Sequence, residues 1–158
     1  MDDTVIHISE EQKDRLATGY LYTGKKADPI SIPAIESAGN FRSTVSDILK
    51  FLNANLGLTD SSLSSVLKYC QENTRIKPKL NPLVRILPKG KYHPKSFDVG
   101  LGWVMLSYDD MQLMGHNGGT EGFSTLMNMN LDKKTGVVVL TNHALKDPSR
   151  IGMDLLRL

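Results

Sequence analysis

The sequence predicts an α+β fold in which an antiparallel β-meander is flanked by helices. Before residue 74, apolar residues recur at the three- and four-residue spacing of amphipathic helices, and after residue 100 they form the short runs that are typical of strands. The helical segments flank the strand segments instead of alternating with them, and the connections between strands are too short for parallel crossovers. Together these observations favour a meander with helices on its outside.

The 158 residues are expected to form a single segment of one globular domain, because the chain is long enough for one core but not for two full domains. Five regions follow one another along it. They are an irregular region at 1–35, a helical region at 36–73, a proline-rich basic stretch at 74–99, a strand meander at 100–142 and a C-terminal helix at 147–158.

Three helices are predicted, two of them from the residues at their starts and one from a stripe of apolar residues. Thr44 and Asp47 have the spacing of a capping box, and apolar residues follow at helical spacing until Gly57. Asp147-Pro148 opens the C-terminal helix, since proline is favoured near a helix start. Another helix is expected from about residue 60 to residue 73, on an apolar stripe formed by Leu63, Val66, Leu67 and Cys70.

The meander is expected to contain strands at 101–107, 111–116, 123–130 and 136–142. Val137–Leu140 is a continuous apolar run, which is typical of a central strand covered on both faces.

The basic stretch has a local excess of positive charge. Seven Lys and Arg residues and no acidic residue lie between Arg75 and Lys95, although the net charge of the chain is only +2. The part between Arg75 and Lys95 also contains four prolines and a single aromatic residue, Tyr92, so a solvated, proline-stiffened excursion is favoured over a nucleic-acid site. A docking surface for an anionic wall polymer or a membrane is the remaining alternative.

Composition excludes several other classes. No run approaches the roughly 18 apolar residues of a transmembrane helix, and the single Cys70 cannot form an internal disulfide. The four histidines lack metal-type spacing, so no metal site and no cofactor are expected.

The segment Gly115–Phe123 is the most unusual part of the chain, with four glycines within eight residues between two predicted strands. Such a density indicates tight turns or a backbone that another group approaches closely. Backbone N–H groups facing a cavity can stabilise an oxyanion, and His116 beside them is a residue type that exchanges protons near neutral pH. An ordinary glycine-rich hairpin with a surface histidine is the alternative.

Four motifs, in this order, resemble the C-terminal part of the serine beta-lactamase and penicillin-binding-protein family, on its class C and esterase side. They are Ala17-Thr18-Gly19-Tyr20; Ser37-Ala38-Gly39-Asn40-Phe41 with the helix start at Thr44; Gly100-Leu101-Gly102-Trp103 with Gly115–Phe123; and Val137–Asn142 running into Asp147-Pro148-Ser149-Arg150. The resemblance covers nearly the whole chain and implies the C-terminal part of a beta-lactamase/transpeptidase-like fold.

By this resemblance, His116-Asn117-Gly118 occupies the place of the family's motif of Lys or His, any residue, then Gly, which lines the active site. His116 would assist proton transfer or substrate orientation, Gly119 would donate its N–H to the oxyanion, and Asn117, Gly118 and Arg150 would contact substrate. Two asparagines that hold a substrate carboxylate in the class C pattern are replaced here by Ala144 and Asp147. That departure puts cephalosporin-like substrates in doubt.

The resemblance also implies a Ser-x-x-Lys nucleophile motif and a Tyr-x-Asn-type motif before Ala17, and neither is present. Ser65-Val66-Leu67-Lys68 fits the first pattern, but it falls inside a predicted amphipathic helix, where a chance match on a solvated face is favoured. We therefore expect the C-terminal portion of a longer serine hydrolase, acting on an amide or ester through an acyl-enzyme and inactive by itself.

The expected partners are the missing N-terminal part of the same domain and a small-molecule or peptide substrate, with possible self-association through an exposed strand edge. A non-catalytic binding or regulatory module that keeps the fold is the alternative function. The compartment is left open by the residues, and the resemblance is consistent with the envelope or the extracellular space.

Overall fold

The computed structural model describes residues 1–28, 33–72, 92–120, 122–144 and 147–158. Most of the proline-rich basic stretch predicted at 74–99 therefore lies outside the described residues. No helix in the described ranges is both long enough and apolar enough to span a membrane.

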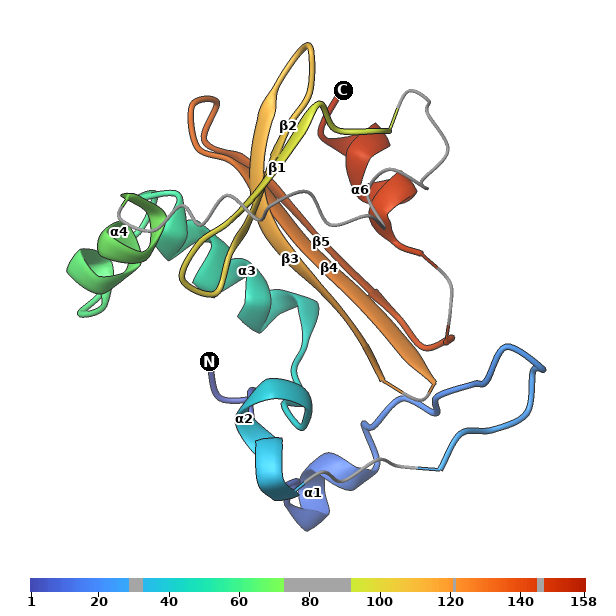
Figure 1. Cartoon of the computed structure of the whole chain (residues 1–158). Helices are drawn as coiled ribbons and strands as arrows, with labels where there is room; N and C mark the ends of the chain where they lie inside the picture. The colour runs from blue at the N-terminus through green and yellow to red at the C-terminus, as the bar shows by residue number, and fades with distance from the viewer. Residues whose placement is uncertain (29–32, 73–91, 121, 145–146) are drawn as a thin grey trace.

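In the described ranges, five strands form one antiparallel sheet, in which each strand pairs with its neighbour in sequence (Figure 1). They are β1 (Ser96–Val99), β2 (Val104–Ser107), β3 (Gln112–Thr120), β4 (Phe123–Asn130) and β5 (Thr135–Thr141). The order in the sheet is β1-β2-β3-β4-β5, which is the meander expected from the short connections.

The helices are short apart from two. They are α1 (Glu10–Lys13), a 3-10 turn η1 (Pro33–Ile35), α2 (Glu36–Gly39), α3 (Val45–Asn55), α4 (Ser64–Glu72) and α6 (Ser149–Leu155). Helix α3 begins as predicted, because the Thr44 hydroxyl accepts a hydrogen bond from the Asp47 backbone N–H at 3.2 Å. Past its end, Gly57 adopts a φ of +66°, which favours glycine.

Helices α3 and α6 cover opposite faces of the sheet, and Gly136 and Val137 on β5 show this. A Cβ atom at Gly136 would lie 2.7 Å from Leu52 of α3, whereas the space above Gly152 of α6 is taken up by Leu126 and Val137. Neighbouring residues of a strand point to opposite faces, so the two helices lie on different sides (Figure 1).

Each face carries its own apolar cluster. The buried residues on the α3 side are Leu52, Leu56, Trp103, Met114 and Met129, and those on the α6 side are Met111, Leu113 and Met153. The sheet is thus the middle layer of three, and two of the four buried methionines, Met114 and Met129, come from its strands.

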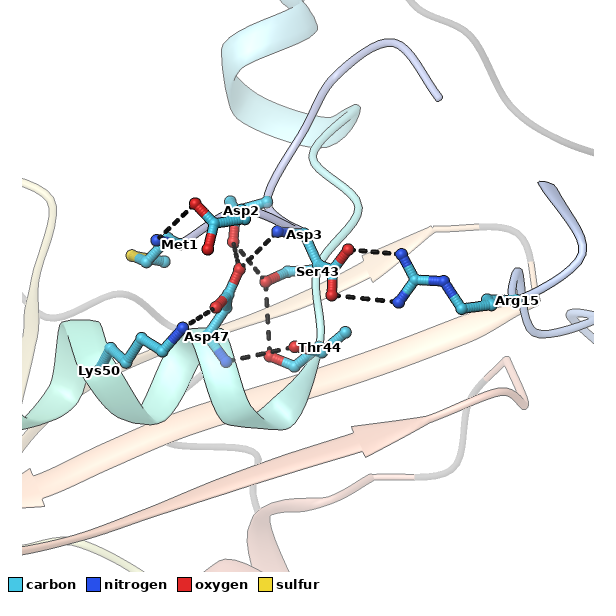
Figure 2. A network of polar contacts seen from close by, with 9 residues as sticks. Met1, Asp2, Asp3, Arg15, Ser43, Thr44, Asp47 and Lys50 are labelled. Carbon is cyan, nitrogen blue, oxygen red and sulfur yellow. Dashed lines mark hydrogen bonds and ion pairs between the residues drawn. The ribbon is translucent and has the colours of Figure 1, made fainter. Parts of the chain in front are cut away.

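The N-terminal segment is tied to α3 through the buried carboxylate of Asp47 (Figure 2). Asp47 accepts hydrogen bonds from the Asp3 backbone N–H at 2.9 Å and from the Thr4 hydroxyl at 3.2 Å, and it pairs with Lys50 at 2.8 Å. The hydrogen bond from Lys50 is the main reason why the pKa of Asp47 lies below its usual range, and burial opposes this shift. This network holds residues 1–4 against the start of α3.

The predicted α+β meander is confirmed, and several details are corrected. Strand β1 lies inside the stretch predicted as a proline-rich excursion, because Pro94 and Asp98 hide the strand pattern. The stripe predicted on α4 is only partly buried: Leu67 is buried, but Leu63 and Val66 are more than half exposed. Strand β5 is covered on both faces as expected, yet it forms an edge of the described sheet instead of its centre.

Candidate active site

The second half of β3 has a free edge. Strand β2 pairs with β3 only from Gln112 to Gly115, whereas β4 pairs with it up to Thr120. Within the described part of the chain, His116–Thr120 is therefore bonded to a neighbouring strand on one side only. Four of the five residues expected to form the site, His116, Asn117, Gly118 and Gly119, lie on this one-sided stretch.

The exposure of β3 changes at the same point. Leu113, Met114 and Gly115 are buried, whereas the next four residues, His116, Asn117, Gly118 and Gly119, are all exposed. Four consecutive exposed residues beside an unpaired edge can be reached by another molecule from outside the sheet.

The hydrogen-bonding direction of β3 can be derived from its turn. Thr120 and Phe123 pair across a two-residue connection, and such closing residues form a hydrogen-bonded pair. Hydrogen-bonded and non-hydrogen-bonded pairs then alternate, so the Gly119–Ser124 pair is of the second kind and the N–H and C=O of Gly119 point away from β4. In agreement, the Thr125 hydroxyl reaches the Gly118 carbonyl at 3.5 Å, on the β4 side. The Gly119 N–H is thus directed to the free edge.

Packing requires glycine at one position of this segment but not at two others. A Cβ at Gly115 would lie 2.0 Å from Oδ1 of Asn128 and 2.3 Å from the Met127 carbonyl, so only glycine fits there. At Gly118 and Gly119 a Cβ would make only ordinary contacts, at 3.4 Å and 3.8 Å. Packing among the described residues therefore does not require glycine at 118 or 119. The absence of side chains there leaves the free edge clear.

Among the described residues, the ring of His116 has one partner, the carbonyl oxygen of Asn117, which lies 2.5 Å from Nδ1. A carbonyl oxygen can only accept, so Nδ1 carries the proton in this contact. In the neutral ring, Nε2 is then the unprotonated nitrogen, and it is free to accept a proton or a hydrogen bond. A protonated lysine side chain, by contrast, can only donate hydrogen bonds.

The turn between β3 and β4 is held by the segment around Tyr20. The Tyr20 N–H lies 3.3 Å from the Gly122 carbonyl and 3.0 Å from the Asn142 carbonyl, and the Asn142 side-chain amide donates to the Thr18 carbonyl at 2.9 Å. Gly19 packs so closely on Phe123 that a Cβ would lie 2.6 Å from its ring. The Ala-Thr-Gly-Tyr motif therefore supports the hairpin that carries His116. Its composition alone gave no indication of this role.

The remaining predicted site residues are not joined to this stretch. Arg150 lies in the first turn of α6 and is exposed, and among the described residues no hydrogen bond or ion pair links it to His116, Gly119 or Asp147. Asp147 instead accepts the Ser149 N–H at 2.9 Å, at the start of α6. No ion pair between Asp147 and Arg150 is thus found among the described residues.

Ser65 and Lys68 lie on the exposed side of α4, which packs on α3. Lys68 pairs with Glu72 at 3.7 Å, one turn further along the helix, and no hydrogen bond joins it to Ser65 in the described structure. Nothing in this arrangement activates the Ser65 hydroxyl, and a chance match remains the interpretation.

Comparison with known proteins gives a consistent result. A sequence model of the family described as Beta-lactamase matches residues 1–158, while a search of curated proteins gives no match. Among solved structures, a class C beta lactamase is similar with 17% identity and a TM-score of 0.79, over 99% of this chain and 48% of that chain. A class C beta lactamase from Rhodobacter sphaeroides has 20% identity and a TM-score of 0.71, over 98% and 49%.

A third similar structure is a beta-lactamase/D-alanine carboxypeptidase from Pseudomonas syringae, with 16% identity and a TM-score of 0.66, over 97% of this chain and 47% of that chain. At these identities the likeness concerns the fold, and it confirms the fold class that the sequence predicts. The chain spans about half the length of these structures.

Proposed function

This chain belongs to the beta-lactamase family, and on that premise we propose that it is the C-terminal portion of a serine hydrolase that acts on an amide or ester through an acyl-enzyme. The candidate substrates are a beta-lactam, a D-amino acid peptide and a carboxylic ester. The observation that supports the proposal is the free edge of β3, where His116, Asn117, Gly118 and Gly119 are exposed together.

In this proposal an extended substrate lies along the free edge of β3, and its reacting carbonyl approaches Gly119. The outward N–H of Gly119 then stabilises the oxyanion of the tetrahedral intermediate, which needs fixed donors about 3 Å from the charged oxygen. Because Gly119 has no side chain, the carbonyl can come close to the backbone. The serine nucleophile and the second oxyanion donor would come from the part of the domain that this chain does not contain.

His116 would act through Nε2, because Nδ1 is engaged by the Asn117 carbonyl. A neutral Nε2 can accept the proton of an attacking hydroxyl or water, or it can hold a donor group of the substrate. The neutral ring of His116 is less suited than a charged lysine to binding a substrate carboxylate.

The first test uses the chain by itself. Intact mass is measured after incubation with a penicillin and, separately, with a fluorophosphonate, both of which trap an activated serine. We expect no adduct, since a site without its nucleophile cannot form an acyl-enzyme. A stoichiometric adduct on Ser65 would refute the assignment of the nucleophile to another part of the domain.

A second test asks whether the β3 edge binds substrate. Amide chemical shifts are followed by NMR while a D-alanyl-D-alanine dipeptide or a penicillin is added. We expect saturable shifts at His116, Gly118 and Gly119, and none at Gly39, which is partly exposed in α2. Shifts scattered over the whole surface, or none at β3, would contradict the proposed site.

A non-catalytic binding module is the second candidate. It is supported by the ring of His116, whose only partner in the described residues is the Asn117 carbonyl and not a nucleophile. The discriminating experiment expresses the chain together with the coding sequence upstream of Met1 and measures hydrolysis of nitrocefin and p-nitrophenyl acetate. Turnover that depends on His116 supports the enzyme, and binding without turnover supports the module.

A further inference from the structure

The step from Asn117 to Gly118 is the one place in the 158 residues where a glycine directly follows an asparagine. Both residues are exposed, and they lie on the stretch of β3 that is paired on one side only within the described part of the chain. Because glycine has no side chain, its backbone nitrogen can approach the side-chain amide of the preceding asparagine without steric hindrance. The step therefore combines a reactive pair of residues with an accessible place in the fold.

The ring of His116 contacts the peptide group that joins these two residues. Its Nδ1 atom lies 2.5 Å from the Asn117 carbonyl oxygen, and that oxygen belongs to the same peptide group as the Gly118 nitrogen. When this nitrogen gives up its proton, amide resonance shares the negative charge with the carbonyl oxygen. A hydrogen bond donated to the oxygen stabilises that charge, as an oxyanion donor does. His116 thus favours the form of the peptide group that can attack as a nucleophile.

We propose that Asn117 is a self-modification site that deamidates through a cyclic imide, and that the Nδ1–H of His116 accelerates this reaction. The Gly118 nitrogen forms a bond to Cγ of Asn117 while the bond from Cγ to the side-chain nitrogen breaks. The side-chain nitrogen leaves as ammonia and takes the proton from Gly118. Water then opens the imide, either at Cγ to give aspartate or at the backbone carbon to give isoaspartate. One water is consumed and one ammonia is released, without oxidation or reduction.

Pairing with β4 restrains the reaction while the hairpin is closed. Gly118 and Thr125 form a hydrogen-bonded pair, because the neighbouring pair toward the turn is of the other kind, so the Gly118 N–H donates to β4. The nitrogen can attack only when this end of the hairpin opens. Opening breaks pairing on one side of β3 alone, because the pairing with β2 ends at Gly115. The contact between His116 and Asn117 joins adjacent residues, so opening does not remove it.

Both products change this edge of the sheet. Aspartate places a negative charge beside His116, where the amide of Asn117 is neutral. Isoaspartate directs the chain through Cγ and lengthens the backbone by one carbon, so Gly118 and Gly119 lose their register with β4. That this edge also binds substrate rests on the proposed function, whereas the modification itself does not.

The test follows the unmodified chain during incubation at neutral pH, with peptide mapping by mass spectrometry that separates aspartate from isoaspartate. We expect both products to accumulate at position 117 and far less at Asn142, which is exposed but followed by His143. His116→Phe removes the Nδ1–H and should slow the reaction of the folded chain roughly tenfold, the typical effect of one hydrogen bond to a charged group. Rates are divided by the opening frequency of each protein, which hydrogen exchange at the Gly118 amide measures.

Two further measurements separate the contact from the sequence. In guanidinium chloride the chain does not hold the ring against the carbonyl, so the parent and His116→Phe should deamidate at equal rates. Gly118→Ala should keep Asn117 unmodified, because the added methyl group crowds the attacking nitrogen. This variant should fold, since a Cβ at Gly118 makes only an ordinary contact with Thr125 at 3.4 Å.

Three results would overturn the proposal. They are the absence of product at position 117 in the folded chain, equal corrected rates for the parent and His116→Phe, and an acceleration by His116 that is as large in denaturant as in the folded state. None of these readouts uses a substrate, so failure of the proposed function would leave them unchanged.

Discussion

The Nδ1 atom of His116 lies 2.5 Å from the carbonyl oxygen of Asn117, the next residue along β3. This contact decides which ring nitrogen is available for chemistry. We predict that the neutral ring of His116 is protonated on Nδ1, which ¹⁵N NMR of the ring nitrogens can detect. His7 is the control, because it is exposed and no ring hydrogen bond of His7 is found in the described structure. A neutral His116 protonated mainly on Nε2 would contradict the proposed role of that nitrogen.

Gly119→Val should reduce acyl transfer strongly in a preparation that contains the complete domain. A β-branched side chain at this position would occupy the space that the substrate carbonyl needs, and loss of one oxyanion donor costs about 10²- to 10³-fold in kcat. Gly39→Val is a suitable control, since a Cβ at Gly39 meets nothing within 4 Å. Hydrolysis of p-nitrophenyl acetate measures both variants. Equal rates would argue against an oxyanion role for Gly119.

Gly115→Ala should affect stability without any substrate being present. The added Cβ would lie 2.0 Å from Oδ1 of Asn128 and 2.3 Å from the Met127 carbonyl, so β3 and β4 would have to separate. Overpacking of this kind costs about 1–3 kcal/mol of unfolding free energy. Urea denaturation of this variant and of Gly119→Ala should show a loss for the first only. A stable Gly115→Ala protein would mean that the hairpin can shift to accept the methyl group.

Asp47→Asn should change the dependence of stability on pH. The hydrogen bond from Lys50, together with those from Asp3 and Thr4, lowers the pKa of Asp47 in the folded state. A carboxyl group with a lowered pKa stabilises the fold at pH values above its unfolded pKa, and this contribution is lost as the pH falls through the folded pKa. The difference in Tm between the two proteins should thus be largest at neutral pH and shrink in acid. Asp2→Asn, which alters an exposed carboxylate, should leave the profile unchanged.

Local patterns were sufficient to predict the helix from Thr44 and the strand at 123–130, because each depends on a cap or on periodicity within the element itself. The position of β5 in the sheet could not be predicted this way. The apolar run of β5 reflects the burial of its two faces by α3 and α6. Burial of the faces does not indicate whether another strand pairs with each edge of β5.

The candidate site was predictable only in part for a similar reason. The sequence singled out His116 and Gly119, but the end of pairing between β2 and β3 at Gly115 depends on where the other strand stops. The support of the turn by Tyr20 joins segments that are distant in sequence, and no local pattern indicates it. Arg150 was expected at the site because of a motif, and the structure gives it no contact there.

The contact between Thr18 and Asn142 has a consequence for the order in which the chain folds. Every strand of the sheet pairs with the strand next to it, so the sheet can form from successive local hairpins at a low entropic cost of loop closure. The hydrogen bond from Asn142 to Thr18 instead joins residues 124 positions apart. The neighbouring Tyr20 also contacts the β3–β4 turn, so this segment can pack only after the turn has formed. The meander should therefore form first, and the segment around Tyr20 should be the last to acquire protection in a refolding experiment.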